Sequence, residues 1–442
     1  MSLQHSYLPG VTRVIVGGCN NLNSGCHSMI RVDGSNLDCI PVLKLHGVVL
    51  YPGFSLPLRL HDPRWTSYLR EKVDEVRFVR SSNMNVVLGI LPADPEEESE
   101  SSSSNANNSS GKKDIGRIGT VAVIESTNIL VDEGDTSENQ RSTRMNNDEV
   151  ILTVLGLCRF RIISCAISHP SEIVDLPLYR LGLLQGDADP PNPPFRVNMR
   201  GTIQTHSMDA FLHSVSPIPR HCWKYVWPHH LVKKIRSIIV DGGPMSEWDG
   251  LRKSSSFPCS KNDSGYFSFW LATHMPLSLG EKVAILEMET VTERLRYILS
   301  FMRLKSHRGI CCRSCDSRLA SVVDLFSLVG ITEGTSGAYV NEHGFVHQTM
   351  TLKKAVEENI WCHGGPQTKD SWFPGYAWTI ANCRRCYHHL GWRFTILPEE
   401  EEEGSIDIDR HPKSFWGFSA MSIKAEGNFH DQVNSNFPRN IG

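Results

Sequence analysis

Short apolar runs broken by turn residues dominate the first half of the chain. The segment Cys39 to Leu60, "CIPVLKLHGVVLYPGFSLPLRL", is interrupted by Pro-Gly. Three further runs follow, at Asn85–Leu91, Ile118–Ser126 and Glu149–Ile163. Runs of this length between turn residues are typical of strands. The first half is therefore predicted to be mainly β.

A helical period replaces this pattern later in the chain. The segment His221 to Gly243 predicts one or two helices, with a break at Pro228. Ser278 to Met302 predicts one helix that opens with a capping box of Ser278 and Glu281. An apolar stripe runs along it and is expected to pack in the core, formed by Val283, Leu286, Val291, Leu295, Ile298 and Met302.

Two stretches lack the apolar residues that an ordered core requires. Residues 1–36 are rich in Gly, Asn and Ser and are predicted to be a disordered tail. Residues 94–114, "DPEEESESSSSNANNSSGKKD", predict a flexible, solvated surface loop.

Composition limits the classes of function that fit. The chain has 442 residues, which suggests two or three domains, and its formal net charge of −3 gives no reason to expect a nucleic-acid partner. No apolar run approaches the roughly 20 residues that cross a bilayer, and the N-terminus lacks the features of a secretory signal. We therefore expect a soluble protein of the cytoplasm and nucleus with no membrane partner.

Four of the thirteen cysteines are spaced as metal ligands. Cys312 and Cys315 form one Cys-x-x-Cys pair, and Cys383 and Cys386 form a second. Two such pairs complete a tetrahedral four-thiolate shell, which leaves no open position and therefore predicts one structural Zn²⁺. Sixty-seven residues lie between the pairs, so the ion would join distant strands. Four unrelated thiols or a redox pair are the alternatives.

Aromatic residues gather around the second cysteine pair. Five of the ten tryptophans lie between residues 307 and 427. Trp372 and Trp378 precede "CRRC", and the strand-like "GWRF" that follows places Trp392 and Phe394 on one face. Spacing alone leaves open whether these rings fill a core or line a ligand pocket.

Three blocks of the C-terminal part together resemble the thalidomide-binding module of the cereblon family. They are "GAYVNEHGFVHQTMTL", "DSWFPGYAWTIANCRRCYHHLGWRF" and "SFWGFSAM", and the likeness extends over roughly 120 residues. It implies a β-tent fold of two antiparallel sheets pinned by zinc. It also implies a tryptophan cage for cyclic imides such as glutarimide.

The resemblance assigns a role to each cage residue. Trp372, Trp378 and Trp392 would be the walls and Phe394 would support the floor. Backbone groups around residues 370–372 would meet the imide edge, and Asn341 and His343 would lie at the rim. Two residues depart from the family pattern: Asp370 replaces a frequent histidine and Glu342 replaces a common proline.

The N-terminal half resembles the substrate-binding N-terminal domain of Lon proteases, through "IPVLKLHGVVLYPGFSLPLRL", "IGTVAVI" and "GLCRFRI". No phosphate-binding G-x-x-x-x-G-K-[ST] loop is present, so no ATPase is expected. The predicted class is mainly β with a helical insert. Its predicted parts are a tail (1–36), a Lon N-terminal-like domain (37–306) with a helical insert at about 200–270, a ligand-binding β-tent domain (307–427) and a second disordered tail (428–442).

The resemblance implies a non-enzymatic substrate receptor of a cullin-4 RING ubiquitin ligase. The helical insert would bind the β-propeller adaptor, with Trp223 to Trp227 as the candidate contact, or else as internal helix packing. The cage would hold small-molecule imides and target proteins that end in a cyclic imide. One alternative is a methyl-ammonium reader that uses the same cage. The other is a methionine sulfoxide reductase of the B type, for which only Cys311 and Cys362 remain as nucleophiles.

Overall fold

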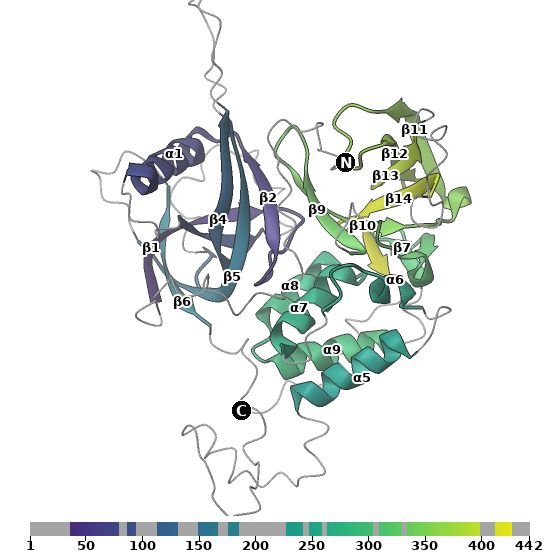
Figure 1. Ribbon diagram of the computed structural model, residues 1–442, viewed down its shortest axis with the longest axis horizontal. Coiled ribbons are helices and arrows are strands. Elements are labelled where there is room, and N and C mark those ends of the chain that lie inside the picture. Colours follow the sequence, from purple (N-terminus) through teal and green to yellow (C-terminus); the bar gives the residue numbers. More distant parts are fainter. Residues whose placement is uncertain are drawn as a thin grey trace, which may run out of the picture.

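The computed structural model describes residues 36–78, 86–93, 113–130, 149–166, 176–184, 227–241, 247–258, 263–303, 309–328, 334–397 and 412–426. Figure 1 shows a β unit from the first half of the chain, a second β unit from the C-terminal part, and a group of helices beneath the latter. The prediction of a mainly β protein with a helical insert is confirmed. No helix among the described residues is long and apolar enough to span a bilayer.

The N-terminal unit is one six-stranded sheet, and an additional pairing between two of its strands closes it into a ring. Its strands are β1 (Asn36–Leu45), β2 (Ser55–Leu60), β3 (Val87–Pro92), β4 (Ile118–Leu130), β5 (Glu149–Ala166) and β6 (Leu178–Leu183), in the order β2-β5-β4-β3-β1-β6. The long strand β5 pairs with β2 along its first half and with β6 along its second half. This pairing closes β5, β4, β3, β1 and β6 into a ring, and closure removes exposed strand edges. Helix α1 (Pro63–Phe78) follows β2.

One end of the predicted acidic loop lies inside this unit. Asp114 is buried, and its carboxylate lies 3.0 Å from Lys44 Nζ and 3.1 Å from Arg117 Nη1. The expectation of a solvated loop was therefore wrong at Asp114, because two cations compensate its buried charge. Residues 94–112 lie outside the described part of the chain, as do residues 1–35 and 427–442, where the tails were predicted.

Between residues 227 and 303, the described part of the chain contains five helices. They are α5 (Pro228–Val240), α6 (Asp249–Arg252), α7 (Ser264–His274), α8 (Leu279–Glu287) and α9 (Val291–Arg303). Pro228 opens α5, where its missing N–H costs nothing. Most residues of α7 are buried on every side, because this helix lies in the core.

The segment Ser278 to Met302 is two helices and not the predicted one. The capping box of Ser278 and Glu281 starts α8, but the chain leaves helical geometry at Met288. Thr290 then caps α9: its backbone N–H donates to the Glu293 carboxylate at 3.1 Å, and its hydroxyl accepts from Glu293 N–H at 3.2 Å. This second capping box, "TVTE", was legible in the sequence and was missed.

A buried arginine of the N-terminal unit stabilises the break between these helices. The Arg159 guanidinium donates to the carbonyls of Leu286 and Met288, both at 2.7 Å, and of Glu289 at 3.2 Å. It thereby satisfies acceptors that the end of α8 leaves without intrahelical partners. The helices are thus tied to β5 by hydrogen bonds as well as by packing.

The C-terminal unit consists of two antiparallel sheets (Figure 1). The larger has the order β11-β12-β13-β14-β10-β9, formed by β9 (Ser336–Val340), β10 (Val346–Leu352), β11 (Ile360–Gln367), β12 (Tyr376–Cys383), β13 (His389–Ile396) and β14 (Ser414–Ser419). The smaller has the order β15-β7-β8, formed by β7 (Gly309–Cys312), β8 (Arg318–Ser321) and β15 (Ile423–Ala425). Short 3-10 helices, η5 (Val322–Asp324) and η6 (Glu357–Asn359), precede β9 and β11.

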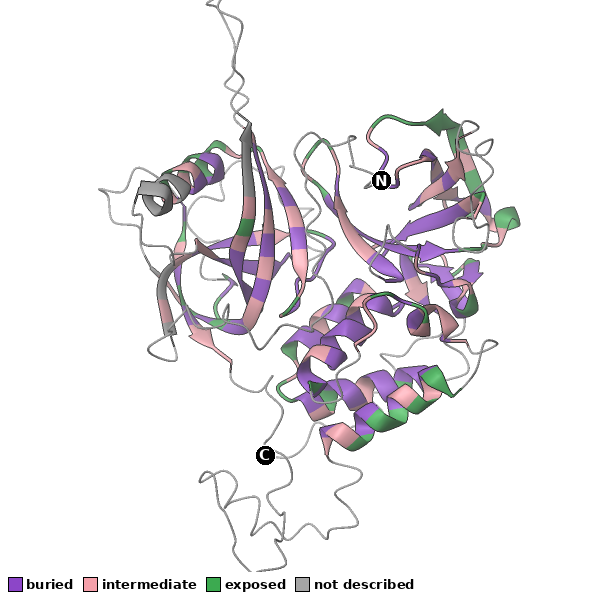
Figure 2. Ribbon diagram, in the orientation of Figure 1, coloured by how far each residue is buried: buried purple, intermediate pink, exposed green. Residues whose placement is uncertain are grey.

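The three parts share one continuous core. Buried side chains from the N-terminal unit, the helices and both C-terminal sheets belong to a single cluster. Figure 2 shows buried residues in all three parts. Tyr51 donates to the carbonyl of Lys282 at 2.8 Å, and Thr335 donates to the carbonyl of His274 at 2.7 Å. The turn between β9 and β10 packs against β2 so closely that a Cβ on Gly344 would lie 2.5 Å from the Arg59 carbonyl.

Candidate metal centre and aromatic cage

Two turns of the same shape present the four predicted cysteine ligands. One turn follows β7, which ends at Cys312, and the other follows β12, which ends at Cys383. Asp316 (φ 60°) and Tyr387 (φ 59°) hold the left-handed position at the end of each turn. Their backbone N–H groups donate to the Cys312 and Cys383 carbonyls at 3.0 and 2.8 Å. Each turn thus points two sulfurs in one direction.

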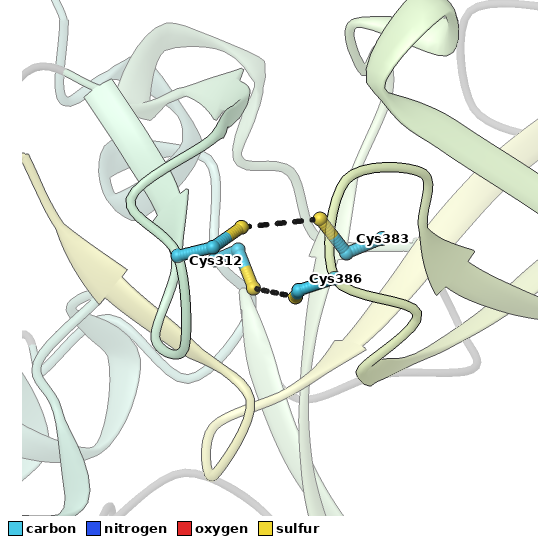
Figure 3. Close-up of side chains that lie close together, drawn as sticks. Cys312, Cys383 and Cys386 are labelled. Atoms are coloured by element: carbon cyan, nitrogen blue, oxygen red, sulfur yellow. Dashed lines mark hydrogen bonds between the residues drawn. The ribbon is translucent and has the colours of Figure 1, made fainter.

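The four sulfurs meet between the turns (Figure 3). They lie within 4.8 Å of one another, with Sγ–Sγ distances of 3.6 Å between Cys312 and Cys386 and 3.5 Å between Cys315 and Cys383. Tetrahedral zinc with bonds of about 2.3 Å separates its sulfurs by about 3.8 Å, so the shell fits zinc. Burial raises the pKa of Cys312 to about 12, so a bound cation must displace its proton.

Strand register places the predicted cage rings on one face of the larger sheet. Trp378 of β12 lies opposite Phe394 of β13, and Trp392 lies opposite Ile380. Side chains of directly opposed residues share a face, and alternate residues along a strand return to it. Phe394 in turn lies opposite Phe415 of β14. The prediction from the alternation in "GWRF" that Trp392 and Phe394 share one face of the sheet is therefore confirmed.

Trp372 reaches this face from the loop between β11 and β12. Its ring meets Trp392 edge to face, with centroids 4.6 Å apart and planes at 74°. Within the described residues, Trp378 lies outside ring contact with this pair. All three indoles are half-buried. They are therefore neither free on the surface nor sealed inside the core.

Hydrogen bonds and a buried floor fix the walls. Trp372 Nε1 donates to the Val340 carbonyl at 3.3 Å, and Trp378 Nε1 donates to the Lys369 carbonyl at 2.7 Å. Phe394 is buried and stacks on Phe415 at 5.0 Å. These contacts reduce the freedom of the rings before any ligand arrives.

Three further rings support the walls, and the sequence reasoning missed them. Tyr339 stacks on Trp372 at 5.1 Å, His347 lies 5.1 Å from Trp392, and His389 lies 5.0 Å from the same indole. Burial lowers the pKa of His347 to about 4, with a further contribution from His389, so its ring is neutral at pH 7. The alternation of "AYVNEHGFVH" was the available signal, because Tyr339 and His347 are paired across β9 and β10.

The remaining predicted site residues lie at the edge of the cage. Asn341 Oδ1 accepts from the backbone N–H groups of His343 and Phe345, at 3.0 and 2.9 Å. Its side chain therefore shapes the β9–β10 turn. Asp370 has a left-handed backbone (φ 56°), and its carboxylate lies 3.6 Å from Lys369 Nζ.

Neither spare cysteine of the C-terminal unit lies on the cage face. Cys362 is paired with Ala381, which points to the face opposite Trp378 and Ile380. Cys311 is buried in β7, and burial raises its pKa to about 11. Among the cysteines that the structure describes, none therefore lies on the cage face as a reductase nucleophile. Of the candidate adaptor contact, residues 223–226 lie outside the described residues, and Trp227 is the half-buried N-cap of α5.

Two known families match successive parts of this chain. The profile described as "ATP-dependent protease La (LON) substrate-binding domain" matches residues 39–303. The chain belongs to this family. A second profile, "Yippee zinc-binding/DNA-binding /Mis18, centromere assembly", matches residues 309–406, which include all four cysteines. One structural zinc is thus supported by a family of zinc-binding domains as well as by the geometry of the shell.

Relatives named "Protein cereblon" extend the match. The protein of Danio rerio is 26% identical over 421 residues, covering 90% of this chain and 83% of that protein. The protein of Gallus gallus is 36% identical over 180 residues, covering 40% and 36%. The resemblance to cereblon drawn from the sequence is therefore confirmed, and no enzymatic family is indicated. A crystal structure of a Lon N-terminal domain protein from Xanthomonas campestris covers 60% of this chain and 98% of its own, at 14% identity and a TM-score of 0.30.

Proposed function

We propose that the chain is the substrate-recognition subunit of a cullin-4 RING ubiquitin ligase and that its cage binds cyclic imides. The ligands would be small molecules of the glutarimide type and the imide-bearing C-termini of target proteins. The relationship to cereblon supports the receptor role. The observation that carries the ligand proposal is the perpendicular, half-buried pair Trp372 and Trp392, with Trp378 on the same face of the sheet.

The chemistry of a cyclic imide suits these walls. Its methylene groups are flat and apolar, and they pack against indole faces. Its carbonyl and N–H edge loses water on entry, so backbone groups near residues 370–372 must supply hydrogen bonds. The neutral ring of His347 behind the walls places no charge beside an uncharged ligand.

In the proposed function, one domain carries the adaptor-binding insert and the other carries the ligand-binding cage. A Lon N-terminal-like domain (37–306) would carry the helical adaptor-binding insert at about 200–270, and a β-tent domain (307–427) would carry the cage. The receptor makes and breaks no bond itself. It raises the local concentration of target lysines near the ligase, as tethering does. Cytoplasmic and nuclear localisation is part of the proposal, and neither nucleic acid nor membrane is expected as a partner.

The direct test is a titration of the full chain with glutarimide, in which binding is measured by calorimetry or fluorescence. Trp392→Ala removes one wall and should weaken binding at least about ten-fold, in the range seen when an aromatic ring is deleted from the centre of an interface. Trp361→Ala is the matched control, because Trp361 is 41% exposed on β11 and lies away from the walls. Equal loss in both variants, or no glutarimide binding by the unaltered chain, would refute the cage assignment.

The ligase role and the ammonium-reader alternative need separate experiments. Capture from cell extract with and without glutarimide should retain the β-propeller adaptor in both cases and lose imide-bearing proteins when the competitor is present. Titration with a trimethyl-lysine peptide tests the alternative, since an aromatic cage also attracts ammonium groups. Tighter binding of that peptide than of glutarimide would replace the imide proposal with a methyl-ammonium reader.

A further inference from the structure

Three charged side chains lie on the loops next to the cage residues, and the ammonium of one contacts the carboxylates of the other two. Lys369 Nζ lies 3.5 Å from the Glu342 carboxylate and 3.6 Å from the Asp370 carboxylate. Glu342 belongs to the β9–β10 turn, whereas Lys369 and Asp370 belong to the loop that leads to Trp372. We call Glu342, Lys369 and Asp370 the charged rim. The rim joins two loops that are distant in the sequence.

The charged rim is attached to the walls of the cage. The Lys369 carbonyl accepts the indole N–H of Trp378 at 2.7 Å. Asp370 stands two residues before Trp372, whose indole N–H donates to the carbonyl of Val340 near the start of the β9–β10 turn. A ligand held by these indoles would therefore lie close to these charges.

The charge of the rim is unbalanced and accessible. Two carboxylates face one ammonium, and the Glu342, Asp370 and Lys369 side chains are 49%, 35% and 80% exposed. The His343 imidazole also lies 3.6 Å from the Glu342 carboxylate, and it adds a positive charge only when it is protonated. Each carboxylate accepts several hydrogen bonds, so contact with Lys369 does not exhaust either group. The lysine stem is flexible, so an incoming cation can join or replace its ammonium. An incoming carboxylate meets two negative groups instead.

We propose that the charged rim selects among imide-ended proteins by the charge of the residue before the imide, favouring a basic residue over an acidic one. This inference rests on the proposed function, because the imide must occupy the cage to place that residue at the rim. One residue spans at most about 3.6 Å, so the residue before the imide would still lie next to the two loops that carry the rim. The rim would thus define the substrate class as C-terminal imides preceded by Lys or Arg.

The test uses three short peptides that end in the same glutarimide and differ only in the preceding residue, Lys, Gln or Glu. Affinities for the full chain are measured at low and at high salt. We expect the Lys peptide to bind about five-fold more tightly than the Glu peptide at low salt, with Gln between them, because exposed charge pairs contribute modestly. High salt should bring the three affinities together.

Variants assign the effect to the rim. The double variant Glu342→Gln with Asp370→Asn should abolish the preference, and asparagine tolerates the left-handed backbone at position 370. Lys369→Gln should enlarge the preference, because it removes the competing ammonium. Glu358→Gln is the matched control: Glu358 is exposed in η6, at the opposite end of β11 from the rim.

The outcomes separate the two proposals. Equal binding of all three peptides, a preference for Glu, or a preference that survives the double variant would overturn the rim while leaving the imide cage intact. Failure of bare glutarimide and of every peptide would overturn the proposed function and the rim with it.

Discussion

Lys282 presents a buried amine at the junction of the three parts, and it provides a sharp test of the packing described above. Its side chain is fully buried in α8, and its Nζ meets no hydrogen-bond partner among the residues that the structure describes. Its own carbonyl accepts from Tyr51 of the N-terminal unit. Burial lowers the pKa of Lys282 from its usual value of 10.5 to about 7, although the nearby Glu281 acts in the opposite direction.

The sign of the effect on stability follows from this pKa. Between pH 10.5 and pH 7 the unfolded chain binds a proton at Lys282 and the folded chain does not. The free energy of unfolding should therefore fall as pH is lowered through this window and level off below about pH 7. One proton contributes about 1.4 kcal/mol per pH unit, so lowering the pH from about 8.5 to 7 should cost about 2 kcal/mol from this group.

Lys282→Met isolates this contribution, since methionine has similar length and no charge. Denaturant unfolding of the full chain is followed at several pH values between 7 and 8.5. The variant should lose the slope assigned to Lys282 and should be more stable than the unaltered chain at pH 7. Lys233→Met, on the exposed side of α5, is the control and should leave the slope unchanged. An identical pH slope in the Lys282 variant would show that its amine is solvated and that the junction is looser than described.

Other predictions concern the metal and the frame of the cage. Cys383→Ser should lower the zinc content measured by metal analysis, and it should unfold the C-terminal unit as seen by its tryptophan fluorescence; retention of one tightly bound zinc would contradict the four-thiolate shell. Gly391→Ala should cost at least about 2 kcal/mol of stability, because its φ is 141° and a Cβ would lie 2.1 Å from the Gly417 carbonyl, whereas Gly365→Ala, with open space around it, should cost little. Thr290→Ala should destabilise α9 by about 1 kcal/mol in denaturant unfolding, and no change would argue against its capping box.

Local patterns predicted the elements well and predicted their ends less well. The strands of the N-terminal unit could be predicted because turn residues flank each apolar run. The helix from Ser278 was extended too far because its apolar stripe continues across Met288 with nearly helical spacing. A tertiary contact stabilises the end of α8. The Arg159 guanidinium, more than a hundred residues away in the chain, donates hydrogen bonds to the carbonyls at the break.

The periodicity of the sequence could not predict contacts between segments that are distant in the chain. The acidic run before Asp114 does not predict that this carboxylate pairs with Lys44 of β1. Likewise, "GWRF" predicts that Trp392 and Phe394 share a face but cannot place Trp372, which stands in a loop. Its position depends on the Val340 carbonyl and on the Tyr339 ring, both from β9.

The zinc shell and the cage are parts of one mechanical unit. Cys383 ends β12, the strand that carries Trp378, and Cys386 lies in the turn that leads into β13, the strand that carries Trp392. Fixing this turn therefore fixes the register of the two strands, and a slip of one residue between them would place Trp378 and Trp392 on opposite faces of the sheet. A zinc ion held by Cys383 and Cys386 would therefore act on the relative position of Trp378 and Trp392 through this turn. The proposed cage thus accounts for the metal ligands and the aromatic residues in one short stretch, because a bound zinc would hold the register that brings these rings to one face.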